Sequence, residues 1–170
     1  ALLGIGTLIY RTPYRWDRIK TFLHISQDAL NKDYHLNEAL TAIGSGGVSG
    51  VGFGQSTAKA GRLPAPINDS IFAVIASELG FIGAGTLIAL FGFLVTRIFW
   101  LAKNVRDHFG RLTLVGFGTI IALQSFANIG AMTGVLPLTG VPLPFVSYGG
   151  TALAVFLTMS GIMTNISKYV

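Results

Sequence analysis

Long apolar runs constrain the fold of this chain more than any other feature. Backbone groups in lipid must be satisfied within the chain, and these runs lack the period-two alternation of barrel strands. The chain is therefore predicted to be an all-α, polytopic helical membrane protein. Three runs come near the roughly 20 residues that a helix needs to cross a hydrocarbon core: Leu79–Leu101, Leu112–Leu136 and Pro144–Ile166.

The composition agrees with this class, since 51% of the residues are hydrophobic and only 11% are charged. Ala1–Tyr10 is apolar but too short to span, and we expect it to be the end of a truncated transmembrane helix. The absence of cysteine excludes disulfides and thiolate metal sites. Three parts are predicted: 1–10, a large loop with short helices over 11–70, and three transmembrane helices within 71–170.

A short basic link predicts how the chain is oriented in the membrane. Lys103, Arg106 and Arg111 lie between the first two apolar runs, and short basic links stay in the cytoplasm under the positive-inside rule. The loop near 102–111 is therefore expected to be cytoplasmic. The 11–70 segment and a hairpin near 134–150 would then share the extracytoplasmic side.

A glycine-rich stretch over Gly44–Gly54 has two interpretations. Glycines let backbone amides approach a ligand closely, and consecutive N–H groups can form a nest for an anion. A flexible or re-entrant turn has the same composition. The stretch is not a phosphate-binding Walker loop, because no Gly-Lys-Ser/Thr follows it.

The hairpin over Gly134–Gly150 is apolar but interrupted by prolines and glycines. Such irregular backbone is tolerated at membrane depth only where it packs on protein or lines a cavity. Just before it, Gln124 and Asn128 lie four residues apart on one helix face. Their amides are expected to form hydrogen bonds between helices or to contact a substrate.

One carboxylate stands at the boundary between a polar loop and an apolar run. Asp69 is costly to hold there unless it caps a helix, pairs with a cation or performs chemistry. Asn68-Asp69-Ser70 lies where an N-cap residue belongs, which favours the capping role from local sequence alone.

The chain contains four ordered motifs: Tyr34–Gly47, Gly52–Lys59, Leu63–Gly83 and Thr133–Gly150. Together they resemble the SEDS family (shape, elongation, division and sporulation proteins), which includes the FtsW and RodA branches. Ser56-x-x-Lys59 is more similar to the FtsW division branch than to the RodA elongation branch.

The resemblance implies the C-terminal part of a larger bundle of membrane helices in the bacterial plasma membrane. It implies a peptidoglycan glycosyltransferase that polymerises lipid II at the extracytoplasmic face. The implied partners are a class B penicillin-binding protein, other divisome proteins and membrane lipids, with no nucleic acid. A lipid-linked precursor flippase or transporter and a non-catalytic divisome scaffold are the alternatives.

Site residues follow from the same resemblance. Asp69 matches the family's essential acid and would act as general base. Lys59 and Arg62 would stabilise the diphosphate, alone or together with a divalent cation such as Mg²⁺ or Mn²⁺; no protein metal site is assigned. Further substrate contacts are predicted at Gly46, Gly47, Ser56, Glu78, Ser147 and Tyr148.

Glu78 has two interpretations, and Ser77 and Ala65 depart from the family pattern. Glu78 lies near the start of an apolar run, where an acid suits the helix dipole, or it supports the catalytic cavity. Ser77 and Ala65 stand where the family usually has an acid.

Overall fold

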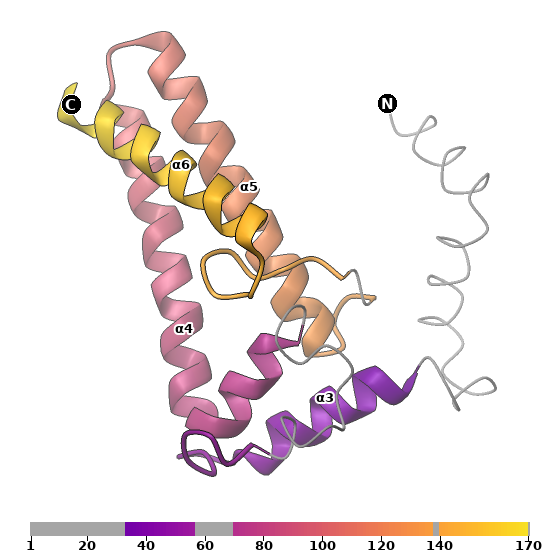
Figure 1. Cartoon of the computed structure of the whole chain (residues 1–170). Coiled ribbons are helices and arrows are strands. Elements are labelled where there is room, and N and C mark those ends of the chain that lie inside the picture. The colour runs from indigo at the N-terminus through magenta and orange to yellow at the C-terminus, as the bar shows by residue number, and fades with distance from the viewer. Residues whose placement is uncertain (1–32, 57–69, 138–139, 170) are drawn as a thin grey trace, which may run out of the picture.

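The computed structural model describes residues 33–56, 70–137 and 140–169 (Figure 1). Every regular element in these residues is helical, which confirms the predicted all-α class. The predicted truncated helix at 1–10 and most of the predicted 11–70 loop lie outside the described residues. The elements are α3 (Asp33–Ser45), α4 (Ile71–Asn104), α5 (His108–Met132), α6 (Gly150–Ile166) and a short 3₁₀ helix, η2 (Ser167–Tyr169).

Helices α4 and α5 run side by side in opposite directions, and α6 crosses them (Figure 1). Gly118 allows the close approach of α4 and α5, because a Cβ at this position would lie 2.9 Å from the Ile98 side chain. Both α4 and α5 are long and apolar enough to cross a membrane, and α6 is a shorter apolar helix. The core between them contains Phe91, Ile98, Leu114, Ile121, Leu143 and Phe156.

Helix α4 is divided by a sharp kink at Gly80, whose φ is 66° and ψ is −164°. Only glycine adopts this conformation readily. The segment Ile71–Leu79 before the kink is largely buried, whereas Phe81, Leu90 and Phe93 after the kink are exposed. The predicted span from Leu79 therefore matches the part of α4 after the kink.

Two predicted spans extend beyond the observed helices. Helix α5 ends at Met132, not at Leu136, because Gly134 turns the chain with a φ of 75°. Helix α6 begins at Gly150, not at Pro144. Phe145 interrupts helical geometry before it, with a φ of 64°.

The loops gather at the two ends of the bundle (Figure 1). The link between α4 and α5 lies beside the C-terminal end of α6, since a Cβ on Gly110 would lie 3.3 Å from the Ile166 side chain. The opposite end holds α3 and the hairpin, where a Cβ on Gly134 would lie 3.7 Å from the Leu36 side chain. Residues 33–56 of the predicted 11–70 loop therefore lie at the same end of the bundle as the hairpin.

Candidate functional site

The glycine-rich loop pairs with the kink of α4 through its main chain. We call the pairing of residues 46–52 with residues 76–82 the glycine clasp. The kink breaks the hydrogen-bond ladder of α4, and the loop supplies replacement partners to both sides of the break. Four bonds cross the clasp: Val51 N–H to Ser77 O (3.0 Å), Gly52 N–H to Glu78 O (3.1 Å), Phe81 N–H to Gly47 O (2.9 Å) and Ile82 N–H to Val48 O (3.3 Å).

Three glycines make this close approach of two backbones feasible. A Cβ on Gly46 would clash with the carbonyl oxygen of Ala76, and a Cβ on Gly50 would clash with that of Glu78. A Cβ on Gly80 would clash with the Gly50 nitrogen. Gly50 and Gly80 also have positive φ values of 81° and 66°. The clasp therefore requires residues without side chains at these positions.

The amides of the clasp are not arranged as an anion nest. Gly46 and Gly47 donate to carbonyls within the preceding turn, at 3.2 and 3.4 Å, and Gly50 donates to Gly46 at 2.8 Å. Val51 and Gly52 donate to α4. The anion-nest interpretation is therefore wrong for these five amides. Contact of Gly46 and Gly47 with a substrate stays a prediction, and only Gly47 of the two is exposed.

Polar side chains are buried next to the clasp. Ser77 is fully buried, and its hydroxyl oxygen lies 3.3 Å from that of Ser45 on α3. The small serine thus fits between α3 and α4. Ser56 and Glu78 are also buried, so neither is open to bulk solvent. Glu78 lies two residues before Gly80, where the second helical segment of α4 starts. The prediction that the Glu78 carboxylate interacts with a helix dipole therefore stays open.

The hairpin is held by side chains of α5. The Asn128 side-chain amide donates to Val141 O at 2.7 Å, and that of Gln124 donates to Pro142 O at 3.1 Å. Both amides form hydrogen bonds, as predicted, but these bonds go to hairpin carbonyls, so the prediction that they join two helices is wrong for them. The prediction that the hairpin packs on protein is also confirmed, since Leu143 and Pro144 are buried.

A tight turn within the hairpin is closed by Ser147. Its buried hydroxyl oxygen accepts a hydrogen bond from Leu143 N–H at 2.7 Å. Between them, Phe145 has a φ of 64°, which is rare for a bulky residue. Its ring packs against Phe156 with the centroids 5.4 Å apart. The turn is held in a strained conformation beside the cavity described next.

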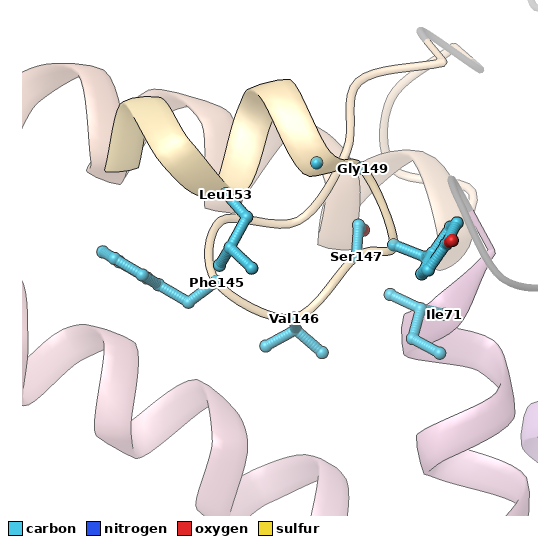
Figure 2. Close-up of a pocket in the computed structure, with 8 residues that line it drawn as sticks. Ile71, Phe145, Val146, Ser147, Gly149 and Leu153 are labelled. Atoms are coloured by element: carbon cyan, nitrogen blue, oxygen red, sulfur yellow. The ribbon is translucent and has the colours of Figure 1, made fainter. Parts of the chain in front are cut away.

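A cavity of about 450 Å³ lies between the hairpin, the start of α6 and the start of α4 (Figure 2). Its wall is mainly apolar, and the Ser147 and Tyr148 side chains bring hydroxyl groups to it. Tyr148 is 77% exposed, so its phenol is available to a bound molecule. This size and character are typical of a ligand site. The lining residues are Ile71, Phe145, Val146, Ser147, Tyr148, Gly149, Gly150 and Leu153.

The structure sorts the predicted site residues into two groups. Ser147 and Tyr148 lie at the cavity. Gly46, Gly47, Ser56 and Glu78 belong to the glycine-rich loop or to its pairing with α4. Both groups contact the first part of α4, which runs from the cavity at Ile71 to the clasp at Gly80. Asp69, Lys59 and Arg62 lie outside the described residues, as does Ala65.

Sequence reasoning missed Gly50, Gly80 and Phe145 as determinants of the site. Gly80 carries a weak signal, because glycine within a helical apolar run can mark a bend. Phe145 carries no such signal. Over the described ranges, no three His, Cys, Asp or Glu side chains are grouped as metal ligands would be.

Comparisons with known proteins agree with the bundle and its two loops. The family model for FtsW, RodA and SpoVE, described as cell cycle protein, matches residues 1–170. Stage V sporulation protein E of Bacillus subtilis is 40% identical over 168 residues, covering 99% of this chain and 46% of that protein. The probable peptidoglycan glycosyltransferase FtsW of the same organism is 48% identical over 129 residues, covering 76% of this chain and 32% of that protein.

Two solved structures share the fold. A chain of a peptidoglycan synthase complex that coordinates polymerization and crosslinking matches with a TM-score of 0.76 at 29% identity, covering 98% of this chain and 46% of that one. A mutant of the rod shape determining protein RodA of Thermus thermophilus matches with a TM-score of 0.59 at 35% identity, covering 76% of this chain and 39% of that one.

The fold and the site define a helical membrane protein with a loop-lined cavity at one end of its bundle. The chain belongs to the FtsW/RodA/SpoVE family, as the resemblance of its motifs predicted. It spans less than half the length of the relatives and structures that it matches here.

Proposed function

We propose that this chain forms part of a peptidoglycan glycosyltransferase that polymerises lipid II at the extracytoplasmic face of the bacterial plasma membrane. The observation that carries the proposal is the apolar cavity beside the start of α4. A lipid-linked sugar needs an apolar surface for its chain and polar groups for its head. The cavity offers both: its apolar surface includes Ile71, Phe145 and Leu153, and the Tyr148 hydroxyl is a polar group at its edge.

Asp69 is the proposed general base, two residues before Ile71 of the cavity wall. In this reaction a sugar hydroxyl of one substrate attacks the anomeric carbon of another. The hydroxyl loses its proton to the Asp69 carboxylate as the new C–O bond forms. The bond to the polyprenyl diphosphate breaks, and its electron pair leaves with the diphosphate. A single displacement of this kind inverts the anomeric centre.

Lys59 and Arg62 are proposed to stabilise the leaving diphosphate. Cations next to developing negative charge stabilise a transition state more than a ground state. Both are close in sequence to Asp69, between the clasp and the start of α4. The named activity of the FtsW relatives supports this assignment.

We also propose a class B penicillin-binding protein as partner. The support is that one structural match is a chain of a synthase complex that coordinates polymerization and crosslinking. Co-purification of the native protein with such a transpeptidase tests this part, and the absence of a complex would reject it.

The Asp69→Asn variant of the native protein tests the base. Ser70 is the N-cap residue of α4, so the capping role that local sequence favours for Asp69 is wrong. Asparagine has nearly the size of aspartate but is a poor base. Polymerisation of purified lipid II in detergent is expected to fall by ~10²–10⁴-fold, the usual contribution of a positioned general base. Membrane insertion and the thermal midpoint of unfolding should not change. Polymerisation at the native rate would reject the assignment, and activity that needs two separate compartments would favour a flippase.

A further inference from the structure

The positive charge of the described residues is confined to one end of the bundle. The residues 33–56, 70–137 and 140–169 contain five lysines and arginines, and all of them are exposed. We call them the basic collar. Its members are Arg97, Lys103, Arg106, Arg111 and Lys168.

Three helix ends bring the collar together. Lys103 lies in the last turn of α4, Arg106 in the link and Arg111 in the first turn of α5. The α5 start contacts the α6 end through Gly110 and Ile166, so Lys168 in η2 lies at the same end (Figure 1). Segments that are far apart in sequence thus contribute to one charged surface.

The link contains one carboxylate, and it already accepts a hydrogen bond. Asp107 is the N-cap of α5, and its side chain accepts a hydrogen bond from Gly110 N–H at 2.7 Å. This bond directs the carboxylate toward the helix start. The positive field of the collar is therefore only partly offset by its single acid.

Aromatic and apolar side chains accompany the charges. The Arg97 guanidinium lies over the Trp100 ring, 4.9 Å from its centroid. Trp100, Phe109 and Leu112 are all more than half exposed, at 53%, 77% and 57%. Arg97 lies seven residues before the end of α4, roughly 10 Å along the helix axis. Trp and Arg at this depth are typical of the membrane interface.

We propose that the basic collar binds anionic phospholipid headgroups of the leaflet at its end of the bundle. Helices α4 and α5 are long and apolar enough to cross a bilayer, and such a crossing places their joined ends at the headgroup layer. Guanidinium groups match phosphate oxygens in charge and in bidentate geometry. Trp100, Phe109 and Leu112 anchor the same surface among the acyl chains. The proposal is independent of the catalytic assignment.

Lipid retention by the native protein tests the proposal. The protein is reconstituted in phosphatidylcholine nanodiscs that contain phosphatidylglycerol or diphosphatidylglycerol, and bound lipid is counted by native mass spectrometry after release. The triple variant Arg106→Gln, Arg111→Gln and Lys168→Gln should lose anionic lipid preference, by about five-fold for each charge removed. The matched control Arg106→Lys with Arg111→Lys keeps the charge and should keep most of the preference.

Four further outcomes distinguish a bound lipid from free phosphate and from an acidic protein as the ligand of the collar. Bound phosphatidylglycerol should quench Trp100 fluorescence when its acyl chains are brominated, and Trp100→Phe should remove that part of the quenching. Competition by inorganic phosphate as strong as by the lipid would overturn the proposal in favour of a free-anion site. Equal retention by the triple variant and the native protein would overturn it outright, as would an acidic protein that occupies the collar in place of lipid.

Discussion

The glycine-rich loop and the proline-rich hairpin both pack against the same end of the bundle, but they are held by opposite means. The clasp joins main chain to main chain across Gly50 and Gly80, where any side chain would obstruct contact. The hairpin is joined to α5 by the side chains of Gln124 and Asn128. One loop therefore depends on side chains being absent, and the other on two particular amides being present.

The largest effect is expected from breaking the clasp at Gly50. In Gly50→Ala the Cβ meets the Glu78 carbonyl oxygen, and the positive φ adds strain. Overpacking and left-handed geometry together should lower the free energy of unfolding by about 3 kcal/mol. SDS-induced unfolding in mixed micelles measures the loss.

Gly44→Ala is the matched control for this variant. Gly44 lies in α3 with no atom near its added Cβ, so alanine should leave stability unchanged or raise it by up to about 1 kcal/mol. Equal unfolding curves for the Gly44 and Gly50 variants would contradict the clasp.

A smaller effect is expected from releasing the hairpin. Asn128→Ala removes a buried donor to Val141 O and should cost about 2 kcal/mol. Gln124→Ala, at a half-buried position with a longer bond of 3.1 Å, should cost less. Protease cleavage within residues 134–149 should rise in the same order. The reverse order would mean that Gln124, not Asn128, holds the hairpin.

Ser147→Ala tests the tight turn within the hairpin. The variant leaves the Leu143 N–H without its acceptor and should cost about 1 kcal/mol in unfolding free energy. Because the serine hydroxyl closes a turn, Ser147→Thr should retain more stability than alanine. A native unfolding curve for the alanine variant would show that the turn holds without it.

The smallest effect on stability is expected at Tyr148, which is 77% exposed at the cavity. Tyr148→Ala should change the unfolding free energy by less than about 0.5 kcal/mol. Its effect should appear instead as a raised KM for lipid II, because the side chain lies where a substrate would bind. An unchanged KM would remove Tyr148 from the proposed site.

The helical class and the apolar runs could be read from sequence, because hydropathy acts through local composition. The hydrogen-bond partners of the two loops could not be read from the sequence. The glycines of 44–54 indicate a close approach, but nothing local says that the approaching backbone is Ser77–Ile82. Gln124 and Asn128 were placed correctly on one helix face, but their acceptors lie in a hairpin whose path depends on tertiary packing.

The starts of helices were harder to predict than the apolar runs themselves. The predicted span starts at Pro144, although the Gly149-Gly150 pair, which is typical of a turn, marks the observed start of α6. The left-handed Phe145 has no such local signal. Ile71–Leu79 reads as a polar-to-apolar transition, yet it folds as a buried helix on α3, and packing decided this boundary.

The kink at Gly80 also reconciles α4 with the thickness of a bilayer. A straight helix from Ile71 to Asn104 would be about 51 Å long, and fitting it into a ~30 Å hydrocarbon core would need a tilt beyond the usual range of 0–40°. The part from Phe81 to Asn104 is about 36 Å long and fits with an ordinary tilt. The bend thus divides one apolar stretch into a portion long enough to span a bilayer and a shorter portion that packs within protein.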